Sequence, residues 1–384
     1  MPTFPIYLDN NATTRTDPRV VEAMLPYFSE VYGNAASQSH GFGWAAAEAV
    51  STARAQVAEL IGADPREIVW TSGATESDNL AIKGVMELFP DPASHFITAV
   101  TEHQAVLDTA KHLEQTGRRV TYLGVDSRGQ ISLDALRAAL TSETVLVSLM
   151  MGNNEIGTLQ PVAEIGALCR EHGILFHSDA TQCIGKMPVS MEALPIDLMS
   201  LTAHKMYGPK GVGALYVRRR APRVRLTAQM DGGGHERGMR SGTLNVPGIV
   251  GFGKAAQICQ NELADEQPKL IVLRDRLIGS ILKTIEGTRL NGHPTERLPH
   301  NANIAFEGLE ADALLAGLPE VALSTGSACS SEAVSPSHVL SAIGLGALAR
   351  SSVRFGLSRD TTEEEVDWVV SKLGEVASRL RRLK

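Results

Sequence analysis

Short apolar runs, rich in β-branched residues, alternate with helical segments through much of this chain of 384 residues. Seven runs have the length and composition of buried strands. They cover residues 67–71, 95–100, 119–125, 144–150, 174–179, 197–202 and 212–217. Because a helical segment separates most of them, the pattern predicts a mainly parallel sheet with helices on both faces. Ligands of such sheets bind beyond the carboxyl ends of the strands, so the residues after each strand are the candidates for chemistry.

The last third of the chain predicts a second, smaller unit. A long helical pattern runs from about Val246 to Ile285. Strand-like stretches follow at 298–308, 321–329 and 351–358. A closing helix comes last, with Thr361 or Thr362 as its N-cap. We therefore expect an α/β fold with two domains. The large domain covers residues 15–258, and the small α+β domain combines residues 1–14 with 259–384.

Composition and charge exclude several classes of protein. The formal net charge of −7 argues against a dominant nucleic-acid surface. No apolar run approaches the ~20 residues that span a bilayer, and the first residues resemble neither a secretory signal nor a transit peptide, which predicts a cytoplasmic protein. The four cysteines lack the spacing of a zinc site or a disulfide framework. We expect reduced thiols and no metal.

A lysine follows the strand at 197–202. Lys205 stands between that strand and the glycine-rich turn GPKGVG, which can reverse the chain. A lysine that is partly desolvated and near other cations can lose its proton near neutral pH and form a Schiff base. The alternative is an ordinary surface lysine beside a hairpin.

The strand at 67–71 runs into a turn of small residues and then a helix. Gly73, Ala74 and Thr75 would let the backbone approach an anion, and the amino terminus of a helix offers unpaired N–H groups. This turn is a candidate phosphate site, although many strand-to-helix turns have a similar composition.

Three more strands end in polar side chains. His103 follows 95–100, and Asp179 ends 174–179 with Gln182 one turn later. Taken singly, the histidine is also compatible with a surface or capping role, the aspartate with a helix cap, and Asn153 and Asn154 after 144–150 with a simple turn. Together, a lysine, a carboxylate, a histidine and an anion site on one sheet edge are what pyridoxal phosphate requires.

Sequence motifs along almost the whole chain make the case specific. The chain resembles the NifS/IscS-type cysteine desulfurases, class V of the fold-type I pyridoxal phosphate enzymes. The motifs that carry the resemblance are YLDNNATT, TSGATESDNLAIKG, TEHQAVLDT, NNEIGTLQP, DATQCIGK, HKMYGPKGVGALYVRR, GGGHERGMRSGTLN, STGSACSS, SPSHVL and RFGLSRDTTEEEVD.

The resemblance implies a role for each residue of a cofactor site. Lys205 would carry the cofactor and move the proton at the substrate α-carbon, Asp179 would pair with the pyridine nitrogen, and Gln182 would meet the ring hydroxyl. His103 would stack on the ring and assist proton transfer. The phosphate would be held by Ala74, Thr75, Thr202 and His204, with Thr243 from the other subunit of a homodimer.

The resemblance also implies how the substrate, L-cysteine, is bound. Asn154 and Arg354 match the positions that bind its carboxylate, and the planar fork of an arginine suits a bidentate carboxylate contact.

A cysteine in a stretch of small and polar residues is the candidate sulfur acceptor. Cys329 lies in STGSACSSEAVSPS, which predicts an exposed, mobile catalytic loop at about 324–336. As a thiolate it would attack the substrate sulfur, giving a persulfide and alanine, and pass the sulfur to an acceptor such as an iron–sulfur scaffold. The alternative is a chance thiol in a linker. Cys169 and Cys259 fit core positions, and for Cys183 we expect a packing role.

Other interpretations stay open. The chain is also compatible with another pyridoxal phosphate enzyme of this fold, such as a selenocysteine lyase or an aminotransferase, and with a non-catalytic assembly partner. It departs from the family pattern at Ala35, where many members have proline, and at Gly152, where a larger residue is usual. Housekeeping members continue past the last helix with a scaffold-docking tail, whereas this sequence stops at Lys384. The destination of the sulfur, whether iron–sulfur clusters, nitrogenase, RNA or DNA, also stays open.

Overall fold

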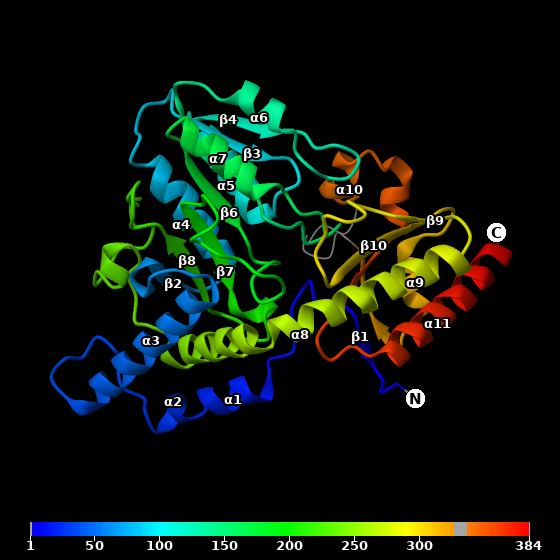
Figure 1. Cartoon of the computed structure of the whole chain (residues 1–384), viewed down its shortest axis with the longest axis horizontal. Helices are drawn as coiled ribbons and strands as arrows, with labels where there is room; N and C mark the ends of the chain where they lie inside the picture. The colour runs from blue at the N-terminus through cyan, green and yellow to red at the C-terminus, as the bar shows by residue number, and fades with distance from the viewer. Residues whose placement is uncertain (1, 326–335, 384) are drawn as a thin grey trace.

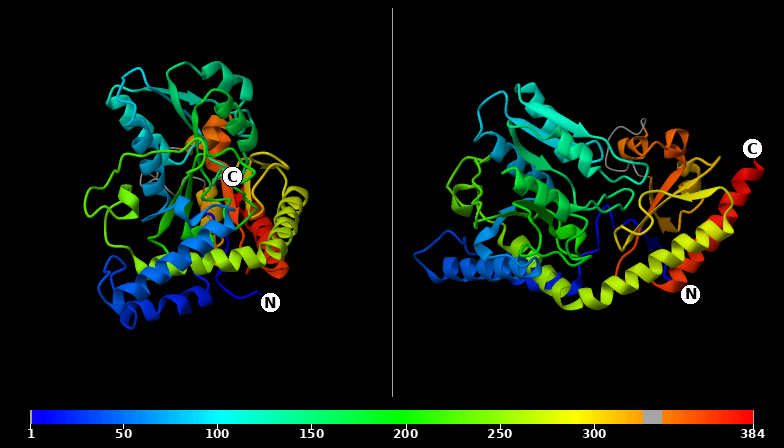
Figure 2. Two further views of the ribbon diagram at one scale, coloured as in Figure 1. Left: turned by 60° about the vertical axis from the view of Figure 1, so that its left-hand side comes forward. Right: turned by 45° about the horizontal axis from the view of Figure 1, so that its top comes forward.

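The structure, a computed structural model, describes residues 2–325 and 336–383 (Figure 1). Two units lie side by side, a larger α/β unit with one large sheet and a smaller α+β unit, and the long helix α8 (Val246–Thr284) runs along both of them (Figure 2). This arrangement confirms the predicted α/β fold class.

The larger unit is built on a sheet of seven strands in the order β2-β8-β7-β6-β5-β3-β4. β8 is antiparallel to both of its neighbours, and the other pairs are parallel. The strands are β2 (Ile68–Thr71), β3 (His95–Ala99), β4 (Arg119–Leu123), β5 (Thr144–Ser148), β6 (Leu175–Asp179), β7 (Leu198–Thr202) and β8 (Gly213–Val217). Each matches one of the predicted strands to within two residues at either end.

Helices cover both faces of this sheet because successive strand side chains point to opposite sides. Trp70 and Ile97 belong to the core beneath α3, α7 and the first half of α8, whereas their neighbours Val69 and Phe96 pack under α4 and α5. The helices of this unit are α1 (Pro18–Met24), α2 (Pro26–Ser29), α3 (Gly41–Leu60), α4 (Ala74–Met86), α5 (Gln104–Gln115), α6 (Leu133–Ala139) and α7 (Val162–Glu171), with short 3-10 helices η1 (Pro65–Glu67), η2 (Ala203–Lys205) and η3 (Glu236–Gly238).

The smaller unit has an antiparallel sheet in the order β12-β13-β10-β9, and a separate parallel pair of β1 with β11. Its closing helix starts at the predicted cap, because Thr362 and Glu365 form a reciprocal capping box. The elements are β1 (Ile6–Tyr7), β9 (Thr288–Leu290), β10 (Asn301–Phe306), α9 (Ala311–Ala316), β11 (Val321–Ala322), β12 (Ser324–Thr325), α10 (His338–Ala342), η4 (Gly346–Ser351), β13 (Ser352–Gly356) and α11 (Glu363–Arg382).

Helix α8 contributes to two separate cores. Ile249 and Phe252, near its start, pack in the main core of the larger unit, and Leu270 and Leu277 pack in the core of the smaller one. The predicted boundary between residues 258 and 259 falls within this helix, and the division into two domains stays a prediction. Across residues 2–325 and 336–383, no helix is both long and apolar enough to span a membrane.

Candidate active site

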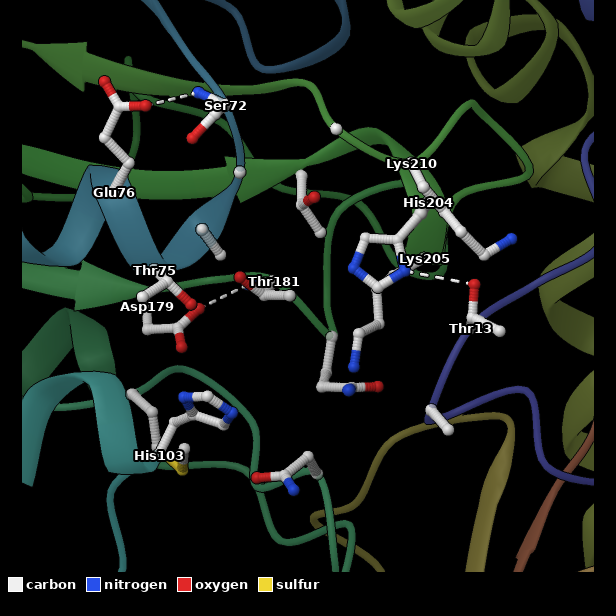
Figure 3. A pocket seen from close by; sticks show the side chains of 18 of the residues that line it. Thr13, Ser72, Thr75, Glu76, His103, Asp179, Thr181, His204, Lys205 and Lys210 are labelled. Atoms are coloured by element: carbon white, nitrogen blue, oxygen red, sulfur yellow. Dashed lines mark hydrogen bonds between the residues drawn. The ribbon is translucent and has the colours of Figure 1, made fainter. Parts of the chain in front are cut away.

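A cavity of about 550 Å³ opens where β2, β6 and β7 end. The side chains of Lys205, Asp179 and His103 come from separate elements and surround one space (Figure 3). The lining also includes Ala12, Thr13, Ser72, Gly73, Ala74, Thr75, Glu76, Met150, Gly152, Asn154, Thr181, Gln182, Thr202, His204, Lys210 and Gly211. Most of the predicted site residues therefore lie on the wall of one cavity.

The lysine is held by the turn that follows β7. Residues 203–205 form the 3-10 helix η2 directly after the strand, and the glycine-rich turn then returns the chain as β8, as predicted. The Lys205 ammonium donates to Asn11 O at 2.5 Å. Its Nζ is thus placed on the cavity wall by a strand end on one side and by the N-terminal segment on the other.

The turn before α4 rests directly on β8. A Cβ at Gly213 would lie 2.6 Å from Gly73 Cα and 2.7 Å from Leu201 O, so only glycine permits this backbone approach. Gly73 provides no side-chain cap to the helix, while Ser72 N is satisfied by Glu76 Oε2 at 2.7 Å. The first-turn N–H groups of α4 and the helix dipole therefore face the cavity as an anion site.

The wall opposite this turn is basic but includes a neutral histidine. His204 Nδ1 lies 3.1 Å from Thr13 Oγ1. Burial, with contributions from Lys205 and Lys210, lowers the pKa of His204 to about 4. At neutral pH the ring is uncharged, so it acts at this wall as a hydrogen-bonding group. Thr202, which also lines the cavity, is buried.

The carboxylate of Asp179 lies at the tip of β6. Its Oδ1 accepts from Thr181 N at 2.9 Å, and the side chain is buried. Thr181 Oγ1 is buried and lacks a partner among the residues that the structure describes. This orphaned hydroxyl and the carboxylate face the same cavity, so two polar groups are available there to a ligand.

His103 is a helix cap and a cavity residue at once. Its Nδ1 accepts from Ala105 N at 3.1 Å at the start of α5. Burial lowers the pKa of His103, against the opposing effect of Asp179. With Nδ1 as an acceptor, the neutral ring carries its proton on Nε2. Both the capping role and the site role therefore apply.

Asn11 is a site residue that the sequence analysis missed. Its Nδ2 donates to Gln182 Oε1, and Gln182 Nε2 donates to Asn11 O, both at 3.0 Å. Asn11 is fully buried, and its Oδ1 also accepts from Asn301 Nδ2. Gln182 lines the cavity but is held by this reciprocal pair. The only signal in the sequence was that Asn11 lies in the motif YLDNNATT.

The remaining predicted residues differ in their position relative to the cavity. Asn154 lines the cavity, whereas Arg354 lies behind it, 1% exposed, and donates to Asn154 O at 3.1 Å and to Asp9 Oδ1 at 2.9 Å. Thr243 is exposed and is not part of this cavity's lining. Cys329 lies outside the described residues.

The other three cysteines are buried. Burial raises the pKa of Cys169 to about 12 and that of Cys259 to about 11, and it raises the pKa of Cys183 further. Cys183 packs behind the cavity wall, because a Cβ at Gly152 would lie 2.8 Å from its Sγ. The same contact explains the glycine at position 152. The predicted packing roles are thus confirmed.

These features fit pyridoxal phosphate. The cavity combines a lysine amine, a buried carboxylate with an orphaned hydroxyl beside it, and an uncapped helix terminus. Over the described ranges, no group of three or more histidine, cysteine or acidic side chains could hold a metal ion.

Comparisons with known proteins agree with this chemistry. Residues 6–369 match the family described as Aminotransferase class-V. The chain is 55% identical to "Cysteine desulfurase IscS" of Anaeromyxobacter sp. (strain Fw109-5) over 99% of this chain and 94% of that protein, and 54% identical to the protein of the same name from Methylococcus capsulatus with the same coverage.

Solved structures show the same relationship. A structure described as "NIFS-LIKE PROTEIN" superposes with a TM-score of 0.90 at 39% identity, covering 97% of this chain and 99% of its own. A second, "SspA in complex with cysteine", has a TM-score of 0.82 at 36% identity and covers 93% and 100%. On these matches, the chain belongs to the class-V aminotransferase family of pyridoxal phosphate-dependent enzymes.

Proposed function

We infer that this chain is a cysteine desulfurase, which uses pyridoxal phosphate to remove sulfur from L-cysteine and releases L-alanine. The observation that carries this inference is the placement of Lys205 and Asp179 on one cavity beside the uncapped start of α4. Relatives at 54–55% identity are named "Cysteine desulfurase IscS", and SspA is described in complex with cysteine.

The cofactor would be held from three sides. Asp179 would bind the pyridine nitrogen, and His103 would contact the ring. The N–H groups at the start of α4, with Thr75, Thr202 and His204, would bind the phosphate. Bound in this cavity, pyridoxal phosphate supplies an electron sink for the substrate α-carbon.

Three side chains of the protein then act on the substrate. Lys205 Nζ takes and returns the proton of the substrate α-carbon, and His103 donates a hydrogen bond from Nε2. The Cys329 thiolate attacks the substrate sulfur, so an S–S bond forms as the Cβ–S bond breaks. The electron pair stays on Cβ, which takes up a proton and becomes the methyl group of alanine. The product on the enzyme is a Cys329 persulfide.

We further propose a homodimer in which Thr243 reaches the phosphate of the partner subunit. Large apolar side chains support an interface on the face formed by α2 and the start of α3, where Phe28, Tyr32, Phe42 and Trp44 are each more than half exposed. A sulfur-acceptor protein, such as an iron–sulfur scaffold, would collect the persulfide. A cytoplasmic location stays a prediction.

One experiment tests the function directly. Purified protein with pyridoxal phosphate is mixed with L-cysteine, and alanine, sulfide and a persulfide on Cys329 are measured, the last by mass spectrometry. We expect equal amounts of alanine and transferred sulfur. No alanine above a Lys205→Ala control would overturn the function.

The same assay separates the other interpretations. A Cys329→Ala variant that retains full turnover of its best substrate would favour a selenocysteine lyase or an aminotransferase. A protein that never binds the cofactor, and so stays colourless, would favour a non-catalytic role.

A further inference from the structure

The guanidinium of Arg354 is already occupied by groups of the chain itself. Arg354 lies in β13 with its side chain 1% exposed. Its Nη1 donates to Asn154 O at 3.1 Å and its Nη2 donates to Asp9 Oδ1 at 2.9 Å. Its Nε is buried and finds no partner in the described part of the chain. Within residues 2–325 and 336–383, one nitrogen of this buried cation is thus without an acceptor.

The position of Asp9 matters because of the shape of the guanidinium group. A carboxylate binds an arginine bidentately along one of two edges, Nη1 with Nη2 or Nη2 with Nε. Both edges include Nη2, the atom that Asp9 occupies. Nη2 has two hydrogens, one at each edge, so a carboxylate at either edge shares Nη2 with Asp9 and brings a second negative charge beside it. An incoming carboxylate therefore competes with the Asp9 contact for Arg354.

The backbone around Asp9 is held independently of the contact between its side chain and Arg354. Asn10 N donates to Gly356 O at 3.1 Å, and Gly356 N donates to Leu8 O at 2.7 Å. These bonds fix the segment around Asp9 against β13, and a Cβ at Gly356 would lie 2.5 Å from Asn11 Oδ1. The Asp9 side chain is 20% exposed, so its carboxylate can turn toward solvent without movement of the backbone.

The Asp9 contact also lies close to the cavity. Arg354 donates to the carbonyl of Asn154, whose residue lines the cavity, and the segment that carries Asp9 continues into Ala12 and Thr13 on the same wall. A buried cation with no partner is costly. Asp9 therefore compensates Arg354 whenever no other carboxylate is present.

We propose that Asp9 is a specificity-determining residue, an internal carboxylate that occupies Arg354 until the α-carboxylate of the substrate displaces it. This inference rests on the proposed function, in which Arg354 binds that carboxylate. The exchange keeps one carboxylate on the buried cation at every stage. The Asp9 contact weakens the binding of every α-carboxylate ligand by the free energy needed to displace Asp9. It leaves the affinity for a ligand that lacks a carboxylate unchanged.

The test uses the full-length holoenzyme and the Asp9→Asn variant, with Asp9→Ser as a second variant in case the first does not fold. L-alanine is titrated while the absorbance of the cofactor is followed, which gives a dissociation constant without turnover. We expect that constant to fall about tenfold, the ratio that one charge-assisted hydrogen bond supports. The KM for L-cysteine should fall in parallel, with little change in kcat.

Cysteamine, which has the amine and thiol of cysteine but no carboxylate, is the matched control ligand. Its dissociation constant should be the same in the wild type and in Asp9→Asn. An unchanged or higher dissociation constant for L-alanine in both Asp9 variants would overturn the proposal. So would equal weakening of L-alanine and cysteamine with a lower melting temperature, which indicates a purely structural role.

An Arg354→Gln variant separates this proposal from the proposed function. It should bind L-alanine at least a hundredfold more weakly if Arg354 is the carboxylate site. Unchanged binding would overturn the exchange at Asp9, whereas the function would still stand if the wild type forms alanine from L-cysteine.

Discussion

Two lysines in the larger unit lie in contrasting surroundings. Lys186 is 1% exposed, with its Nζ 3.4 Å from Glu266 Oε1 and 3.5 Å from the centre of the Tyr207 ring. Burial lowers its pKa to about 8. Lys205 lies on the cavity wall, and its ammonium contacts a neutral carbonyl, Asn11 O. The lysine with the lowered pKa, Lys186, is therefore not the one that a ligand in the cavity can reach.

The buried lysine belongs to a cluster around Tyr207, in the turn that carries Lys205. The Tyr207 ring is enclosed by Lys186 and by Arg359, whose guanidinium carbon lies 3.8 Å from the ring centre. The Tyr207 hydroxyl donates to Glu266 Oε1 at 2.7 Å. Tyr207 has a φ of +63°, an unusual conformation for a residue with a side chain. It follows Lys205 by two positions, so the cluster fixes the turn that presents Lys205.

The largest expected effect separates the two lysines by function. Lys205→Ala should lower the rate of alanine formation from L-cysteine by at least about 10⁴-fold, because it removes the amine proposed to move the α-carbon proton. Lys186→Met should retain turnover within about tenfold, because its ammonium never reaches the cavity. Initial rates with saturating cofactor measure both. Comparable loss in the two variants would show that the two lysines do not differ in function.

The thiols allow a related test, because Cys169, Cys183 and Cys259 are buried and the sequence predicts that Cys329 is exposed. A pKa of about 12, as for Cys169, leaves on the order of a thousandfold less thiolate at neutral pH than a free thiol has. In the folded protein, iodoacetamide should therefore modify Cys329 first, with Cys169, Cys183 and Cys259 modified only on unfolding. Peptide mapping after timed labelling would show this. Rapid labelling of a buried cysteine would contradict the structure.

Removing the partner of Lys186 should destabilise the fold rather than the chemistry. Glu266→Gln leaves the Lys186 ammonium buried without its carboxylate, while Arg359 retains Asp17 and Glu262. We expect the free energy of unfolding to fall by about 3–5 kcal/mol at pH 7. Urea unfolding measures this change. The double variant with Lys186→Met should regain part of the loss, and a double variant as unstable as the sum of the singles would show that the pair is not coupled.

The smallest expected effect is a pH dependence of the free energy of unfolding, caused by the buried Lys186. The pKa of Lys186 is lowered from 10.5 to about 8 in the folded state, so the unfolded chain binds more protons between pH 8 and 10.5. The free energy of unfolding should therefore gain up to about 3 kcal/mol from Lys186 as the pH rises through that window. Lys186→Met should lack this rise. Urea unfolding at pH 8, 9 and 10 compares the slopes, and equal slopes would refute the assignment.

Much of the larger unit could be predicted because its signals are local. A strand such as β6 is a run of apolar residues, and Asp179 at its end is visible in the same few residues. The contacts of the N-terminal segment were not predictable in this way. Asn11 meets Gln182 across 171 positions and Lys205 across 194, and Asp9 meets Arg354 across 345. β1 has two residues, too few to show a periodicity.

The contacts of Arg354 were equally hard to predict from the sequence. The resemblance predicts that Arg354 binds a carboxylate, yet nothing near residue 354 in the sequence indicates that an aspartate from the other end of the chain already contacts it. Partners that come together only through tertiary structure leave no local pattern.

Helix α8 has a consequence for how the protein can be divided. It is 39 residues long, and buried side chains from its two halves complete different cores. A cut between the two units would therefore break a hydrogen-bonded helix and leave each fragment with an apolar stripe in water. Neither fragment should fold well alone, so the two units are expected to melt in one cooperative transition.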